Sequence, residues 1–169
     1  MIVGIIGSGG REHAICAKIK ESPKINKIFC IPGNAGTKKI AENIDIKIDD
    51  FKSIKEFCNK NKIDLLIVGP EQPLVDGIVD YMEGSKVKVF GPNKIASQLE
   101  GSKIFTKKIC KKYKIPTANF KIFENLNDTK KYLTNSKYPI VIKSDGLAAG
   151  KGVYICKNYA EGEIAVKEI

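Results

Sequence analysis

Short apolar runs alternate with polar stretches of helical character along the first 92 residues of the chain. The apolar runs, which we expect to form buried strands, are residues 2–6, 27–31, 44–48, 65–68 and 87–90. Helices are expected between them at 11–21, 51–61 and 75–82. Continuously apolar strands joined by helices form parallel sheets with both faces covered. The pattern therefore predicts an α/β fold with a Rossmann-like parallel sheet.

A different pattern follows residue 101. We expect a lysine-rich helix at 102–113, a strand at 118–123 and a helix at 128–134. Two further strands, 139–143 and 153–156, flank a loop of glycine and alanine and resemble a hairpin. We therefore expect two domains, 1–101 and 102–169, of which the second is incomplete because the chain ends a few residues into a new helix.

The composition is that of an ordinary globular protein, with 43% hydrophobic and 28% charged residues. No apolar run approaches the roughly 18 residues needed to cross a bilayer, so we expect a cytoplasmic protein without a membrane partner. The net charge of +10 is the balance of 28 lysines and a single arginine against 19 aspartates and glutamates. These lysines are scattered, whereas nucleic-acid recognition favours clustered cations and arginine forks. A specific nucleic-acid partner is therefore not expected, although a basic nucleic-acid-binding protein stays an alternative.

A glycine-rich turn, residues 7–12, follows the first predicted strand at the place of a dinucleotide-binding motif. That motif, G-x-G-x-x-G, has a third glycine where this chain has Glu12, and a carboxylate there would crowd a pyrophosphate. A nicotinamide cofactor is thus disfavoured, although a Rossmann-type nucleotide-binding module stays open. Backbone N–H groups at a helix start suit a smaller phosphate, which Arg11 would clamp. The alternative is a tight turn with a solvated arginine, and His13 is expected to have a packing role.

Two more turns, 32–36 and 69–74, also follow predicted strands. Glu71 in the second is placed to accept hydrogen bonds from sugar hydroxyls, while a rigid proline-flanked turn is the alternative. The carboxyl ends of parallel strands share one edge of a sheet, which is where ligands bind in such folds. Three turns converging there predict a site for a phosphorylated sugar.

The loop 143–152 is the other informative segment. Its small residues let backbone donors approach a polyphosphate, and Lys143 and Lys151 supply positive charge. It is not a Walker A motif, because Gly152 follows Lys151 where serine or threonine would be required. We interpret it as a lid over a triphosphate, with a disordered hairpin tip as the alternative.

Together these motifs resemble one known family, the phosphoribosylamine–glycine ligases, also called glycinamide ribonucleotide synthetases. The segments that carry the resemblance span the whole chain and are residues 7–14, 32–37, 68–71, 99–103 and 143–153. The resemblance implies an N-terminal substrate (pre-ATP-grasp) domain followed by the start of an ATP-grasp domain. It also implies the family's reaction, in which ATP phosphorylates glycine and the nitrogen of 5-phosphoribosylamine attacks the glycyl phosphate to give glycinamide ribonucleotide, ADP and phosphate.

The resemblance further implies roles for individual residues. The residues expected to contact ATP are Lys107, Lys143, Ser144, Asp145, Gly146, Leu147, Ala148, Ala149, Gly150, Lys151 and Gly152. Those expected at the sugar phosphate are Gly9, Gly10, Arg11, Asn34 and Glu71. The ligands for Mg or Mn are expected beyond residue 169, so the isolated chain should be inactive. The sequence does not fix the oligomeric state, and a monomer is compatible with it.

Overall fold

The computed structural model describes residues 1–148 and 150–169. They form two compact units, Met1–Gln98 (unit 1) and Leu99–Ile169 (unit 2). No helix in this described part of the chain is both long enough and apolar enough to cross a membrane.

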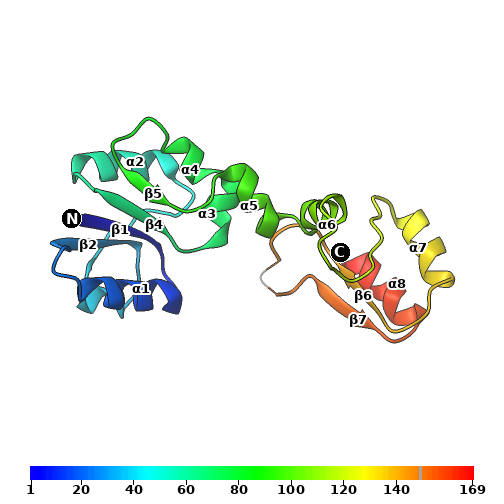
Figure 1. The fold of residues 1–169 in the computed structure, drawn as a ribbon. Coiled ribbons are helices and arrows are strands. Elements are labelled where there is room, and N and C mark those ends of the chain that lie inside the picture. The colour runs from blue at the N-terminus through cyan, green and yellow to red at the C-terminus, as the bar shows by residue number, and fades with distance from the viewer. Residues whose placement is uncertain (149) are drawn as a thin grey trace. The chain divides into compact units, whose positions relative to one another are not determined.

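Unit 1 is built on a five-stranded sheet with the order β3-β2-β1-β4-β5 (Figure 1). Its strands are β1 (Ile2–Gly7), β2 (Lys27–Pro32), β3 (Glu42–Asn43), β4 (Leu65–Val68) and β5 (Lys88–Phe90). All of the strand pairs are parallel, and Ile5 of the central strand lies opposite Cys30 of β2 and Ile67 of β4. The predicted parallel sheet is confirmed.

Helices cover both faces of this sheet. They are α1 (Gly10–Lys20), α2 (Phe51–Lys60), α3 (Glu71–Asp76) and α4 (Ile78–Tyr81), with the 3-10 turn η1 (Thr37–Lys39). A further helix, α5 (Lys94–Gly101), follows β5 along the chain. Figure 1 shows α1 on one face and α2 and α4 on the other. Alternate side chains of β2 follow this division, because Cys30 packs with Cys16 of α1 while Ile31 packs with Ile54 of α2. Burial on both faces explains why the central strands β1 and β4 carry no polar side chain.

Two expectations for unit 1 are wrong. The strand expected at 44–48 is instead the two-residue β3, which pairs with Phe29 and Cys30, and the isoleucines of 44–48 pack against the core from a segment without regular structure. The helix expected at 75–82 begins earlier, at Glu71, and is broken into α3 and α4 at Gly77, whose φ of 101° is left-handed. A helix cannot continue through a left-handed residue.

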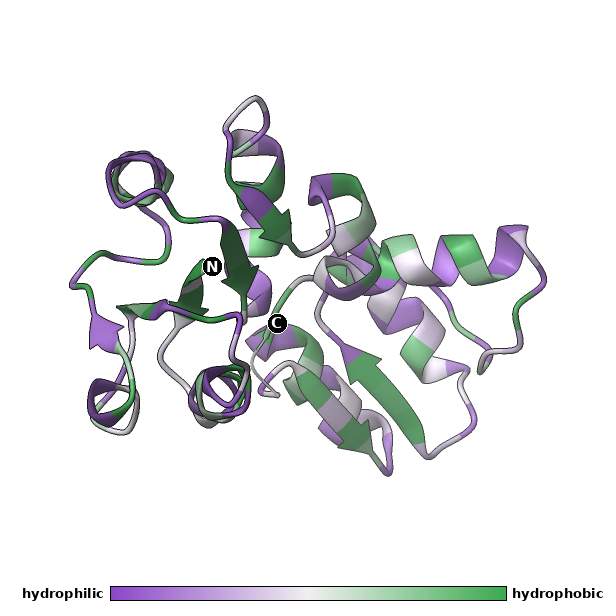
Figure 2. Ribbon diagram, turned by 60° about the vertical axis from the view of Figure 1, so that its left-hand side comes forward, coloured by the Kyte–Doolittle hydropathy of each residue, from purple (hydrophilic) through white to green (hydrophobic). Residues whose placement is uncertain are grey.

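Unit 2 contains α6 (Lys103–Lys112), α7 (Leu126–Thr134), β6 (Ile140–Lys143), β7 (Val153–Cys156) and α8 (Tyr159–Glu168). The strands β6 and β7 form the expected antiparallel hairpin, with Val141 opposite Ile155. The buried hydrophobic side chains of unit 2 are Leu133 of α7, Cys156 of β7 and Ala165 of α8. Figure 2 shows mainly hydrophobic colour on the strands of the hairpin and both colours on the helices, as expected for helices with one buried side. The strand expected at 118–123 is wrong: this segment has no regular structure and pairs with neither strand of the hairpin.

Candidate functional site

The three turns that follow β1, β2 and β4 come together in unit 1, and Asn34 joins the first two. Its side-chain Nδ2 donates to the carbonyl oxygens of Ser8 (2.9 Å) and Gly9 (3.2 Å). Its Oδ1 accepts from the backbone N–H groups of Gly36 (2.7 Å) and Thr37 (2.9 Å). An amide has two donor hydrogens and two acceptor lone pairs, so this side chain has its full complement of partners within the protein.

Glu12 joins the first turn to the third. Its carboxylate is buried, with 3% of the residue exposed, and Oε2 accepts from the N–H of Gly9 at 2.7 Å. A Cβ atom at Gly7 or at Gly69 would lie 2.6 Å from Glu12 Cγ, which is closer than real Cβ atoms approach. The glycines of two neighbouring strand ends therefore enclose this carboxylate. Its side chain occupies the space beside the turn, which explains how a residue other than glycine is accommodated at the third motif position.

Arg11 lies between two carboxylates. Its Nε donates to Glu12 Oε1 and its NH1 donates to Glu71 Oε1, both at 2.9 Å. Hydrogen bonding to Arg11 lowers the pKa of Glu71, so that Glu71 is ionised at neutral pH. About half of each of the Arg11 and Glu71 side chains remains exposed. The structure thus brings Gly9, Arg11, Asn34 and Glu71 into one connected set, with Gly10 next to it at the start of α1.

Sequence reasoning missed two supporting residues of this site, Thr37 and Asn43. The Thr37 hydroxyl is fully buried and accepts from the Asn34 N–H, and its single hydrogen donates to one of two nearby acceptors, Asn34 O at 2.9 Å or Asn43 Oδ1 at 2.8 Å. Asn43 Nδ2 donates to Asn34 O. A polar pair at a turn carries no distinctive sequence signal. His13 lies against Gly36, where a Cβ atom would be 2.7 Å from the imidazole Cε1, which agrees with the packing role expected for it.

In unit 2 the glycine-rich loop is closed at its base. Ser144 N–H donates to Gly152 O at 3.0 Å, and Lys151 N–H donates to Ala148 O at 2.8 Å. A Cβ atom at Gly152 would lie 2.8 Å from the Cβ of Ala148 and closer still to the Ser144 hydroxyl. Gly152 is therefore required for the two ends of the loop to meet. Ala149, one of the residues expected to contact ATP, lies outside the described residues.

Asp145 links this loop to the start of α6. Its carboxylate accepts from the Ile104 N–H (3.1 Å) and the Ser102 hydroxyl (2.9 Å), and Lys103 Nζ donates to Gly146 O at 2.7 Å. Burial alone would raise the pKa of Asp145, but the hydrogen bonds from Ile104, Ser102 and neighbouring N–H groups outweigh it, so the pKa is lowered. Asp145 thus binds the protein's own helix start.

We expect Asp145→Ala to lower the free energy of unfolding of unit 2 by about 1–2 kcal/mol, because it removes the acceptor for the first turn of α6. Asp145→Asn keeps one acceptor and should cost less. The advantage of the wild type over Asp145→Asn should shrink as the pH falls through the lowered pKa of Asp145, where the carboxyl becomes protonated in the folded state. Urea unfolding at pH 7 and at acidic pH measures both effects. Glu124→Ala, at an exposed carboxylate of the same unit, is the control and should change little.

The lysines expected at ATP differ in their surroundings. Lys107 Nζ donates to the Thr117 hydroxyl (2.6 Å) and to Ala118 O (3.2 Å), and it lies 5.3 Å from the centre of the Phe120 ring. The side chains of Lys143, at the end of β6, and of Lys151, within the loop, are exposed. Leu147 is also exposed, while Ala148 is half-buried.

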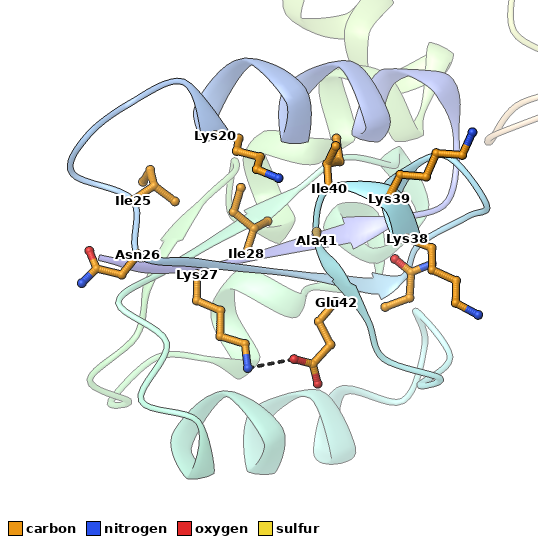
Figure 3. Close-up of a pocket in the computed structure, with 11 residues that line it drawn as sticks. Lys20, Ile25, Asn26, Lys27, Ile28, Lys38, Lys39, Ile40, Ala41 and Glu42 are labelled. Atoms are coloured by element: carbon orange, nitrogen blue, oxygen red, sulfur yellow. Dashed lines mark ion pairs between the residues drawn. The ribbon is translucent and has the colours of Figure 1, made fainter.

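A hollow of about 710 Å³ lies beside β2 and contains none of the predicted site residues (Figure 3). One of its lysines, Lys27, is paired with Glu42 at 2.8 Å. In Figure 3, Lys38 and Lys39 extend away from Lys20 and Lys27, so the cations do not converge on one point. The other lining residues are Ile25, Asn26, Ile28, Ile40, Ala41 and Asn43. The connected turns, where donors and carboxylates do converge, are the better candidate site.

No group of three or more His, Cys, Asp or Glu residues within 1–148 and 150–169 is arranged to hold a metal ion. The carboxylate of Glu12, in the turn after β1, and the carboxylate of Asp145, in the glycine-rich loop, instead accept hydrogen bonds from backbone N–H groups of the protein. We therefore assign no described residue as a metal ligand.

Comparison with known proteins agrees with this arrangement of two units. Residues 1–100 match the family model described as "Phosphoribosylglycinamide synthetase, N domain", and residues 101–169 match "Phosphoribosylglycinamide synthetase, ATP-grasp (A) domain". The parallel α/β unit and the hairpin with its glycine-rich loop thus place the chain in the ATP-grasp class of proteins. More particularly, the chain belongs to the phosphoribosylglycinamide synthetase family.

Individual relatives support this assignment. The chain is 50% identical over 163 residues to the phosphoribosylamine–glycine ligase of Caldanaerobacter subterraneus subsp. tengcongensis, covering 96% of this chain and 39% of the relative. It is 48% identical to the ligase of Clostridium acetobutylicum, covering 99% of this chain and 40% of the relative. The crystal structure of the Thermotoga maritima ligase matches with a TM-score of 0.76 and 33% identity, over 97% of this chain and 38% of that chain. The chain thus spans about two fifths of the length of these relatives.

Proposed function

We propose that the intact gene product carrying this sequence is a cytoplasmic phosphoribosylamine–glycine ligase. It would join glycine to 5-phosphoribosylamine at the expense of ATP, giving glycinamide ribonucleotide, ADP and phosphate. The observation that carries this proposal is the 50% identity to a phosphoribosylamine–glycine ligase over 163 residues. The family matches over both units support it, and so does the division between the units at 98/99, close to the domain boundary that we place at 101/102.

Unit 1 would bind the phosphorylated ribose. Gly10 begins α1, where N–H groups and the helix dipole favour an anion, and Gly9, whose own N–H donates to Glu12, would face the phosphate without a side chain. Arg11 would contribute a forked donor to the phosphate, because Nε and one NH1 hydrogen are engaged and its other N–H groups remain for a ligand. Glu71 would accept hydrogen bonds from the sugar hydroxyls. Asn34, whose amide is fully bonded within the protein, would act by positioning the turn that carries Gly9.

Unit 2 would bind ATP. Loop 144–152 would close over the phosphates, with its backbone N–H groups and Lys151 as donors. Lys143 and Lys107 would contribute further positive charge, and Asp145 would hold the loop against α6. In the reaction an oxygen of the glycine carboxylate would attack the terminal phosphorus of ATP and ADP would leave. The amine of phosphoribosylamine would then attack the glycyl carbon, and phosphate would leave.

A divalent ion, Mg or Mn, is expected for a reaction between ATP and a carboxylate, because it neutralises phosphate charge. The described residues do not fit a metal site, so we derive no step through the metal from this chain.

Ribose 5-phosphate should stabilise the chain against thermal unfolding, because it binds the folded unit 1 and not the unfolded chain. Arg11→Ala should weaken this binding by about tenfold or more, since it removes a charged donor from the phosphate. The measurement is the melting temperature as a function of ligand concentration, with Lys20→Ala, at the other end of α1, as the control.

The intact gene product should form ADP only when ATP, glycine and phosphoribosylamine are all present. ADP formation independent of glycine would contradict the proposed reaction.

A further inference from the structure

The hollow beside β2 lies where one edge of the sheet of unit 1 is not covered by a full strand. On one side, β1 pairs with all six residues of β2, from Lys27 to Pro32. On the other side, the two-residue β3 pairs with Phe29 and Cys30. Within the described residues, Lys27 and Ile28 therefore have no strand partner on that side, and both of them line the hollow. A strand edge of this kind can add an extended peptide through its backbone N–H and C=O groups.

The floor of the hollow is apolar and is fixed by the core. Ile28 is buried within the core cluster on the α1 side of the sheet. Three half-buried neighbours pack against that cluster, namely Ile25, Ile40 and Ala41. All four residues line the hollow, whose volume of about 710 Å³ lies within the range of about 300–1,000 Å³ typical of ligand pockets. A partner that covers this preformed floor buries apolar surface without having to order it first.

Positive charge surrounds the apolar floor. The lining residues include four lysines and one glutamate, which gives a net charge of +3. Lys27 is paired with Glu42. The other three lysines, Lys20, Lys38 and Lys39, are exposed and form no ion pair within the part of the chain that the structure describes. Figure 3 shows Lys38 and Lys39 toward the carboxyl end of β2, away from Lys20. Cations spread in this way complement an extended anionic chain better than a single phosphate.

An acidic peptide fits this surface better than a nucleic acid does. Single-stranded nucleic acids bind through aromatic side chains on which their bases stack and through arginine. None of the lining residues, all of which belong to the described part of the chain, is aromatic or an arginine. Side chains leave both sides of an extended peptide, so one peptide can place apolar groups over the floor and carboxylates at the lysines.

We propose that the hollow beside β2 is a docking groove for an extended acidic peptide of a partner protein. The peptide would continue the sheet at Lys27 and Ile28, cover the apolar floor, and pair its carboxylates with Lys20, Lys38 and Lys39. The groove contains none of the residues assigned to the sugar phosphate or to ATP, so this binding goes beyond the proposed reaction and is independent of it.

The test measures by fluorescence anisotropy, at constant ionic strength, how a short labelled peptide of alternating glutamate and valine binds to the chain. Three companion peptides each remove one feature of this parent peptide. The first has glutamine for glutamate, the second has serine for valine, and the third has N-methylated backbone nitrogens, which cannot donate to a strand. A single-stranded DNA oligonucleotide serves as the competitor.

The proteins are the wild-type chain, the double variant Lys38→Gln/Lys39→Gln and the control Lys52→Gln/Lys60→Gln. The control makes the same change of net charge at two exposed lysines of α2, which do not line the hollow. Thermal unfolding of each variant confirms that it is folded.

We expect the parent peptide to bind the wild-type chain and each companion peptide to bind more weakly. Lys38→Gln/Lys39→Gln should weaken binding of the parent peptide by about tenfold, which is within the range for the loss of two exposed ion pairs. The control should stay within about twofold of the wild type, because a solvated lysine outside the groove contributes only screened, long-range attraction.

Four results would overturn this inference. The first is that the parent peptide does not bind the wild-type chain. The second is an equal loss in both lysine variants, which would reflect general attraction to a basic protein. The third is equal binding of the N-methylated peptide, which would exclude strand addition. The fourth is displacement of the peptide by the oligonucleotide together with weaker oligonucleotide binding in Lys38→Gln/Lys39→Gln, which would make the groove a nucleic-acid site.

Discussion

Replacing Gly69 with alanine should lower the free energy of unfolding of unit 1 by about 3 kcal/mol. The new Cβ atom would lie 2.6 Å from Cγ and 2.7 Å from Cδ of Glu12, whose carboxylate is buried and bonded to Gly9 N–H and Arg11. Overpacking of a buried site typically costs about 1–3 kcal/mol, and loss of a buried carboxylate's hydrogen bond adds to that. Gly69 has no left-handed φ, so backbone strain contributes nothing and the contact itself carries the effect.

Urea unfolding monitored by circular dichroism measures this loss, and Gly10→Ala provides the matched control. A Cβ atom at Gly10 would meet no atom within 4 Å, and Gly10 begins α1, the helix that carries Glu12. Its replacement should therefore leave stability unchanged or raise it slightly. The double variant Gly69→Ala/Glu12→Ala should be more stable than the sum of the single effects predicts, because the second change removes the clash. Equal stability of Gly69→Ala and Gly10→Ala would show that Glu12 moves aside without cost.

The sheet of unit 1 was predictable because burial on both faces leaves a strong pattern in the sequence. Residues such as Leu65, Leu66, Ile67 and Val68 are all apolar since alternate side chains enter different cores. Residues 44–48 and 118–123 carry a similar local pattern but do not form strands, because a strand also needs a partner, and sequence periodicity does not report one. Gly77 shows the same limit for helices, since its left-handed conformation is not specified by the residues around it.

The candidate site was predictable in its location but not in the function of its carboxylates. Turns after parallel strands meet by topology, which is why Arg11 and Glu71 are in contact although 60 positions separate them. Sequence reasoning treated Glu12 as an obstacle to pyrophosphate and Asp145 as a residue near ATP. In the structure each accepts hydrogen bonds from backbone N–H groups of the protein, and Asp145 does so across 41 positions. The tertiary structure determines which backbone N–H groups a carboxylate meets, and a short sequence motif does not contain that information.

Lys143→Ala should reduce the rate of ADP formation by the intact gene product by about 100-fold or more, while the stability of unit 2 changes by less than about 0.5 kcal/mol. The rate should fall because a cation fixed at a strand end stabilises the charge that develops on the transferred phosphate. Stability should hold because the Lys143 side chain is exposed at the end of β6. Steady-state kinetics with ATP, glycine and phosphoribosylamine measure the first effect, and urea unfolding measures the second.

Lys157→Ala is the matched control, since Lys157 is an exposed lysine of the same unit that directly follows β7. It carries the same charge and side-chain length, but it lies beyond the end of the hairpin that is opposite the glycine-rich loop, because β6 and β7 are antiparallel. Its replacement should leave the rate within about twofold of the wild type, as expected for a solvated surface charge. Similar losses in both variants would mean that the rate depends on the net charge of a lysine-rich protein. A loss confined to Lys143→Ala would mean that it depends on the position of one cation beside the loop.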